Sequence, residues 1–276
     1  GLGHRHKLPC LNVRAPEPTR TGPRRNRLMG DRERMAEPPV VLAISSHVVR
    51  GAVGLRIMVP CLEVLGHEVW ALPTCVLSTH PGIARPVGHR TPAEEIEAIG
   101  ETLDDDGALM RVRGVVTGYF RDADQVRAAV RVVEHVKEAN PQAIYLCDPV
   151  LGDTDRGLYV SDATAAAIRD RLMPLADIAT PNAFELSWLT GRNVTGPNEA
   201  ESAAREAGGA VVAVTSVPLA GRRLGTALVA PDTAHWVSSD RRPRVPRGTG
   251  DALSALLLGF MLKDMAGDKA MHRTVV

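Results

Sequence analysis

Four consecutive residues, Gly248, Thr249, Gly250 and Asp251, combine a flexible turn with a carboxylate. They directly precede an apolar stretch, residues 252–262, that predicts a helix. The glycines allow a tight turn, and the free N–H groups of the first helical turn favour an anion. Two interpretations fit these residues. Asp251 either caps the helix, or it takes a proton from an attacking hydroxyl while the N–H groups hold a phosphoryl group.

Two further acids follow predicted strands. Asp148 stands between the apolar residues 143–147 and Pro149, which forces the chain to leave the strand in an extended conformation. Asp148 therefore either closes an Asx-turn or points its carboxylate into a cleft. Asn182 and Glu185 have the spacing of a capping box at a helix start. Two acids at neighbouring strand ends also suit a hydrated Mg²⁺, so Asp148 and Glu185 are candidate metal residues acting through water.

The elements that must position these residues follow an alternating pattern. From Val40 onward, short apolar segments alternate with helical ones, which predicts an α/β fold: a three-layer α/β/α arrangement around a mostly parallel sheet. The predicted strands are residues 40–45, 69–72, 114–118, 143–147, 178–179 and 210–215, with an antiparallel hairpin of 226–230 and 235–238. The predicted helices are residues 55–65, 92–103, 123–139, 162–172, 182–190, 199–207 and 251–263.

Ligands bind beyond the carboxyl ends of parallel strands, so polar residues after each strand are candidates for a site. Residues 45–47 end the first predicted strand, Thr74 follows the second, and Tyr119 follows the third. The sequence has no P-loop motif, and no G-x-G-x-x-G follows the first strand. A lone histidine such as His80 is typically a hydrogen-bonded pocket or surface residue.

Composition excludes several classes of protein. Of the 276 residues, 44% are hydrophobic and 3% aromatic, which supports one main domain with an aliphatic core and disfavours aromatic platforms for nucleic acid. Residues 1–39 hold nine Lys or Arg and four Asp or Glu, which leaves 24 and 28 for the remainder. The mildly acidic remainder disfavours a nucleic-acid surface. No apolar run is long enough to span a membrane.

The cysteines and the N-terminal segment complete this outline. The four cysteines show no C-x-x-C and no metal-ligand spacing, which predicts reduced thiols in a cytoplasmic protein. Residues 1–38 are rich in Arg, Pro and Gly without apolar periodicity. We expect them to be a disordered or non-native leader, and residues 39–276 to form the folded domain.

Taken together, these segments resemble the ribokinase-like superfamily, and within it the pyridoxal kinases. The motifs that carry the resemblance are Ser45-Ser46-His47-Val48-Val49-x-Gly51-x-x-Gly54, Thr74 with Ser78-Thr79-His80, Thr117-Gly118-Tyr119, Cys147-Asp148-Pro149-Val150-x-Gly152, Pro181-Asn182-x-x-Glu185-Leu186 and Gly248-Thr249-Gly250-Asp251. The resemblance implies transfer of the ATP γ-phosphoryl group to the 5′-hydroxymethyl of pyridoxal, with pyridoxine and pyridoxamine as further substrates. It also implies a homodimer that uses Mg²⁺, with K⁺ as a further candidate, and that binds neither nucleic acid nor membrane.

The resemblance assigns roles residue by residue. Asp251 would be the catalytic base, with the N–H groups of Gly248, Thr249 and Gly250 stabilising the transferring group. The implied substrate-binding residues are Ser46, Thr74, His80, Tyr119 and Asp251. The implied ATP-binding residues are Asp148, Glu185, Thr215, Arg244, Val245, Pro246 and Arg247.

Three departures from the family pattern keep alternatives open. Leu55 stands where family members commonly have Asn, and Thr215 where Lys is frequent. Only 25 residues follow Asp251, so we expect a shortened C-terminus relative to the family. The alternatives are a kinase for hydroxymethylpyrimidine or another small molecule of the same superfamily, and a catalytically impaired protein that binds vitamin B6.

Overall fold

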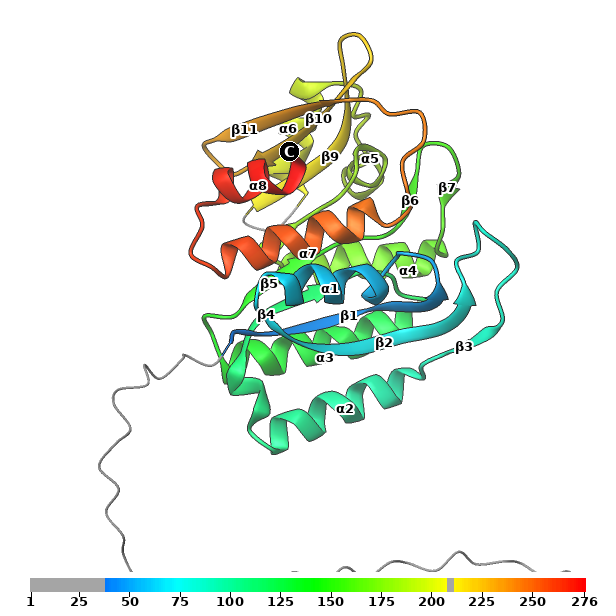
Figure 1. The fold of residues 1–276 in the computed structure, drawn as a ribbon, viewed down its shortest axis with the longest axis vertical. Coiled ribbons are helices and arrows are strands. Elements are labelled where there is room, and N and C mark those ends of the chain that lie inside the picture. Colours follow the sequence, from blue (N-terminus) through cyan, green and yellow to red (C-terminus); the bar gives the residue numbers. More distant parts are fainter. Residues whose placement is uncertain (1–37, 208–210) are drawn as a thin grey trace, which may run out of the picture. The chain divides into compact units, whose positions relative to one another are not determined.

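A mostly parallel sheet organises the fold (Figure 1). The structure is a computed structural model that describes residues 38–207 and 211–276. In spatial order the strands of the large sheet are β11 (Ala234–Asp240), β10 (Arg223–Val229), β9 (Val211–Leu219), β8 (Ile178–Ala179), β5 (Ile144–Cys147), β4 (Val112–Thr117), β1 (Val40–Arg50), β2 (Glu68–Thr79) and β3 (Gly88–Arg90). Neighbours from β9 to β2 are parallel, whereas β10, β11 and β3 join as antiparallel strands. The predicted fold class and the predicted hairpin are confirmed.

Helices cover both faces of this sheet. One face carries α1 (Leu55–Val64), α7 (Thr249–Met261) and α8 (Gly267–Val275), and Figure 1 shows α1 and α7 side by side. The other face carries α2 (Ala93–Asp105), α3 (Ala123–Ala139), α4 (Asp162–Ala167), α5 (Ala183–Thr190) and α6 (Pro197–Glu206). The alternation along β1 explains the two layers, since Leu42 and Ile44 join one buried cluster while Val41 and Ala43 join the other.

The first two strands are longer than predicted. After a register shift between Ser45 and His47, β1 and β2 keep pairing with each other as far as Arg50 and Thr79. The β4 strand leaves β1 at Thr117, so within this extension β1 pairs with β2 and no longer with β4. Residues 45–47 and Thr74 therefore lie within strands rather than after them, which corrects the predicted strand ends.

Several short elements were not predicted. They are β3, the small hairpin of β6 (Gly152–Asp153) and β7 (Gly157–Leu158), the 3₁₀ turn Ala108–Arg111 and α8. The predicted helix 162–172 is α4 continued by a π-helical turn, Ile168–Leu172, and a 3₁₀ turn, Met173–Leu175. Strands of two or three residues with glycine have too little alternation to be recognised.

The predicted leader falls on residues 1–37, outside the described residues, apart from Pro38. None of the described helices has both the length and the apolar character needed to cross a membrane.

Candidate active site

The glycine turn before α7 packs against the segment that follows β1. Gly248 has a φ of 88°, and a Cβ there would lie 1.7 Å from the carbonyl oxygen of Ala52. Gly54 has a φ of 55°, and its Cβ would lie 2.2 Å from the carbonyl oxygen of Ser46. Both positions therefore require glycine for backbone conformation and for close approach. Gly250 differs, because a Cβ there would meet nothing within 4 Å. The space beside Gly250 is open to a ligand.

Asp251 lies in the first turn of α7 and is only partly exposed. Burial raises its pKa to about 6, against the opposing effect of hydrogen bonds from the backbone N–H groups of Gly54 and of Asp251 itself. A carboxylate with this pKa is ionised near pH 7.5 and is more basic than an ordinary aspartate. These are the properties of a general base that works at neutral pH.

Ser254 connects α7 to two neighbouring strands. Its hydroxyl donates to Oδ2 of Asp148 at 2.9 Å and lies 2.8 Å from Oγ1 of Thr180, which follows β8. Asp148 is 6% exposed. Its burial and, after that, the charges of Asp251 and Glu185 raise its pKa well above the ordinary value. The hydrogen bond from Ser254 opposes that rise. The structure thus brings Asp148 to the helix that carries Asp251. Ser254 was not predicted as a site residue, because it stands within an apolar helical stretch.

Glu185 forms the predicted capping box. Its backbone N–H donates to Oδ1 of Asn182 at 3.0 Å, and its Oε2 accepts the Asn182 N–H at 2.8 Å. Its Oε1 accepts the N–H groups of Leu151 at 3.0 Å and Gly152 at 3.3 Å. Burial raises the pKa of Glu185 to about 8, although these backbone hydrogen bonds oppose the rise. Because both oxygens accept backbone hydrogen bonds, Glu185 suits contact with a metal through water rather than direct ligation.

The predicted substrate residues divide into two groups. Thr74 is fully buried, its Oγ1 donates to the carbonyl of Tyr119 at 2.7 Å, and the Tyr119 N–H donates to Oγ of Ser45 at 3.1 Å. Ser46 is also buried, and its carbonyl lies against Gly54. The structure therefore gathers these residues where β1, β2 and β4 end or separate. Burial raises the pKa of the Tyr119 hydroxyl.

His80 belongs to the second group, together with the loop that precedes α7. Its Nδ1 accepts the Gly82 N–H at 3.0 Å, and burial, then the charges of Arg247 and Arg156, lower its pKa. Arg247 donates to the carbonyl of Gly82 at 3.3 Å. Arg247 thus lies beside His80 rather than beside Thr215. The side chains of Arg244 and Val245 are exposed, as is that of Pro246.

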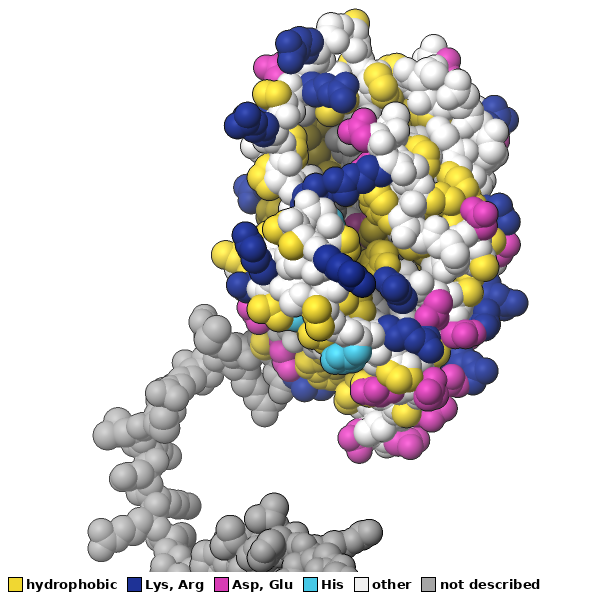
Figure 2. Space-filling model, turned by 90° about the vertical axis from the view of Figure 1, so that its right-hand side faces the viewer, with side chains coloured by type: hydrophobic (Ala, Val, Ile, Leu, Met, Phe, Trp, Pro, Cys, Tyr) yellow, Lys and Arg dark blue, Asp and Glu magenta, His cyan; other side chains and the backbone are white. Residues whose placement is uncertain are grey.

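Thr215 lies on β9, at some remove in the sheet from the β1–β2 extension. Its N–H donates to the carbonyl of Pro181 at 3.0 Å, and it forms an isolated bridge with Asn182. Thr215 is therefore held by the segment of Pro181 and Asn182, whereas Arg247 lies against Gly82 and His80. Figure 2 shows Lys and Arg side chains beside a hollow on the face that it presents. Cations in this position favour a polyanionic ligand.

The donor set fits Mg²⁺ that is held largely by water and phosphate. Within residues 38–207 and 211–276, no three His, Cys, Asp or Glu side chains are grouped as ligands of one metal ion. No ion pair of these residues neutralises Asp148, Glu185 or Asp251. Without a cationic partner these buried acids hold a proton more readily, as their raised pKa values show, and a bound cation would favour their ionised form. Mg²⁺ uses few carboxylates, retains waters and binds phosphates, which matches this arrangement.

Comparisons with known proteins show which family this chain resembles. The family model of phosphomethylpyrimidine kinase matches residues 83–275. The chain is 37% identical to pyridoxal kinase PdxY of Corynebacterium diphtheriae over 246 residues, which cover 85% of each protein. It is 36% identical to pyridoxal kinase PdxY of Granulibacter bethesdensis over 245 residues, which cover 84% of this chain and 85% of that protein.

Solved structures show the same likeness. Pyridoxal kinase from Entamoeba histolytica superposes with a TM-score of 0.81 at 30% identity, over 86% of each chain. Pyridoxal kinase from Leishmania donovani in complex with ADP and pyridoxine superposes with a TM-score of 0.79 at 32% identity, over 86% of this chain and 83% of that one. Sequence relatives, family model and fold agree, and this chain belongs to the pyridoxal kinase family.

Proposed function

We propose that this protein is an ATP-dependent pyridoxal kinase, which transfers the γ-phosphoryl group of ATP to the 5′-hydroxymethyl group of pyridoxal. Pyridoxine and pyridoxamine are further substrates in this proposal. The observation that carries it is the position of Asp251: a carboxylate with a pKa of about 6 lies at the start of α7, beside a glycine turn with open space at Gly250. Family membership supplies the substrate class.

The reaction requires a base and a site for developing negative charge. In the proposed mechanism, Asp251 accepts the proton of the attacking hydroxyl, while the N–H groups of Gly248, Thr249 and Gly250 stabilise the charge on the transferring group. Gly54 supports the base, because its N–H donates to the Asp251 carboxylate. Positioning supplies most of the catalysis in phosphoryl transfer, which explains why this turn packs directly on residues 51–54.

The remaining residues bind the two substrates. Ser46, Thr74, His80 and Tyr119 would contact pyridoxal, and Thr215 with residues 244–247 would contact ATP. When bound, Mg²⁺ neutralises charge on the phosphates. Asp148 and Glu185 would hold it through water, and K⁺ is a further candidate cation. The acids at this edge of the sheet support the cation assignment, because they have no Lys or Arg partner among the described ion pairs.

We also propose a cytoplasmic homodimer. Cys61, Cys75 and Cys147 are free thiols, which fits a reducing compartment. The homodimer follows from the family resemblance and is tested by light scattering of the purified protein.

A substrate panel tests the proposed function. Purified protein with ATP and Mg²⁺ is assayed for ADP release with pyridoxal, pyridoxine, pyridoxamine, hydroxymethylpyrimidine and ribose. We expect the highest kcat/KM with a B6 vitamer. A higher value with hydroxymethylpyrimidine, which the name of the matching family model makes the second candidate, would overturn the substrate assignment. Tight pyridoxal binding without ADP release would instead identify a non-catalytic binding protein.

A further inference from the structure

A fully buried amide lies next to the proposed pyridoxal residues without belonging to them. Gln125 is in the first turn of α3, and its side chain has no exposed surface. A buried amide that lacked partners would destabilise the fold, so its hydrogen bonds show what it holds in place.

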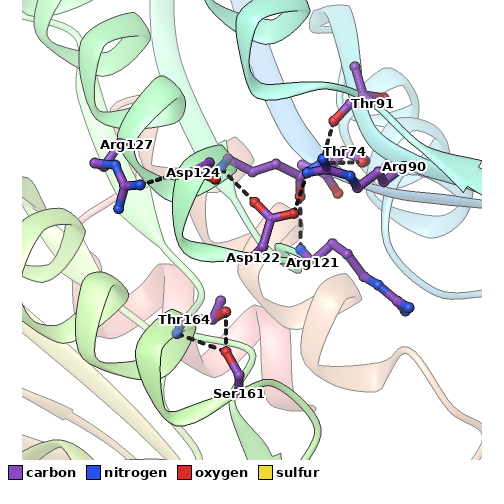
Figure 3. Close-up of polar contacts among 10 residues, drawn as sticks. Thr74, Arg90, Thr91, Arg121, Asp122, Asp124, Arg127, Ser161 and Thr164 are labelled. Carbon is purple, nitrogen blue, oxygen red and sulfur yellow. Dashed lines mark hydrogen bonds and ion pairs between the residues drawn. The ribbon is translucent and has the colours of Figure 1, made fainter.

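The Gln125 side chain joins three segments that are distant in sequence. Nε2 donates one proton to the carbonyl of Thr74 at 2.7 Å and the other to the carbonyl of Thr91 at 2.6 Å. Oε1 accepts the backbone N–H of Arg121 at 2.8 Å. Figure 3 shows Thr74, Thr91 and Arg121 converging at this point. Both donors of the amide are used, and they fix its orientation.

The first turn of α3 is itself anchored by side-chain contacts, so the backbone that carries the Gln125 amide has a fixed position. Asp122 caps the helix by accepting the Gln125 N–H at 3.0 Å, and its other oxygen pairs with Arg90 at 2.6 Å. Arg90 is the last residue of β3 and directly precedes Thr91. The cap and the amide therefore attach the same helix end to the same strand end (Figure 3).

The hydrogen bonds of the Gln125 side chain reach two of the segments that carry the proposed pyridoxal residues. Gln125 holds the backbone of Thr74 through its carbonyl, and it holds the segment after β4 through the Arg121 N–H. The hydroxyl of Thr74 in turn donates to the carbonyl of Tyr119, two residues before Arg121. The Thr74–Tyr119 contact is thus held from both ends by one side chain.

We infer that Gln125 is a positioning residue for the vitamer side of the site, setting the places of Thr74 and Tyr119 without touching the substrate. The inference rests on the proposed function. The nucleotide side is held by separate contacts, since Asp148 is fixed by Ser254 and Glu185 by the capping box. Loss of the Gln125 amide should therefore weaken pyridoxal recognition and leave ATP recognition unchanged.

The test compares Gln125→Glu with Gln142→Glu. The first substitution keeps the size of the side chain but replaces the amide with a carboxyl group. A carboxyl group can donate at most one proton, whereas the two carbonyls accept two from the amide. Gln142 is exposed, so its substitution controls for the added charge. We expect Gln125→Glu to raise the pyridoxal KM about tenfold or more while the ATP KM stays within about twofold of wild type. The control should leave both values unchanged.

Two outcomes would overturn the inference: an unchanged pyridoxal KM, whether or not the melting temperature falls, or an equal rise in both KM values. If Gln125→Glu does not fold, Gln125→Asn replaces it, because this shorter amide keeps the chemistry but cannot span both carbonyls. The same split between the two KM values is then expected. Wild-type turnover of pyridoxal is measured first, so failure of the proposed function is recognised separately.

Discussion

Replacing Asp251 with Asn should inactivate the protein and stabilise it at the same time. The substitution removes the proposed base but keeps the shape of the side chain. General-base catalysis contributes about 10²- to 10⁴-fold, so kcat should fall by about 10² or more. Binding of pyridoxal should change little, because the base acts on the transition state.

The gain in stability follows from the raised pKa. Burial moves the pKa of Asp251 from 3.8 to about 6. Well below pH 3.8 the carboxyl is protonated in both the folded and unfolded states, and its ionisation has no effect on stability. As the pH rises from about 4 to about 6, the unfolded chain releases this proton while the folded state still holds it, so stability is lost across that window. Above pH 6 the folded state holds an ionised, desolvated carboxylate, and the loss is complete. The shift corresponds to about 3 kcal/mol at pH 8, which the neutral amide avoids.

The assay is thermal unfolding without nucleotide, with EDTA present, at pH 4.5 and pH 8. A domain of this size gains about 2–4 °C per kcal/mol, so Asp251→Asn should raise the melting temperature by roughly 6–12 °C at pH 8 and by about a third of that at pH 4.5. The control is Asp162→Asn, which removes an exposed acid from the first turn of α4 and should slightly destabilise that helix. A lower melting temperature for Asp251→Asn at pH 8, or wild-type turnover, would refute the reasoning.

Four further substitutions test the packing of the site. Gly250→Ala should leave the melting temperature equal or higher but reduce kcat/KM for ATP at least about tenfold, because its Cβ meets no protein atom yet enters the space for the phosphoryl group. Gly248→Ala should instead unfold readily, since its Cβ would clash with the Ala52 carbonyl; equal melting temperatures for the two variants would contradict this. Glu185→Ala should destabilise by about 3 kcal/mol in urea unfolding, because three backbone N–H groups lose their acceptor, and a loss below about 1 kcal/mol would argue against that network. Leu55→Asn should destabilise by about 2 kcal/mol or more without restoring activity, since Leu55 is 2% exposed and belongs to the core; a gain in kcat would show that a polar group is missing there.

The sequence was sufficient for most of the fold because burial sets a clear periodicity. The apolar residues of β1 and the Leu-rich stretch of α7 are recognisable from hydropathy alone, and the capping box at Asn182 and Glu185 is a local pattern. The extension of β1 and β2 was not predictable, because it depends on pairing between the strands rather than on either strand. The amphipathic helix α8 buries Ala270 and Met271 but has many polar residues, and it was missed.

The candidate site was predictable to the extent that its residues follow strands. Asp148 and Asp251 were identified by position, and the structure brings them together through Ser254. Neither Ser254 nor Gln125 was identified, because a buried polar residue in a helix has the same sequence signal as a surface one. Only tertiary contacts show that Gln125 holds three segments.

The most direct test of the account is whether purified protein makes pyridoxal 5′-phosphate. A single-turnover reaction with γ-labelled ATP, Mg²⁺ and pyridoxal is analysed by mass spectrometry, with wild type and Asp251→Asn in parallel. We expect labelled pyridoxal 5′-phosphate from the wild type and about 10²-fold slower formation from the variant. Labelled product at equal rates from both proteins, or none from the wild type, would contradict it.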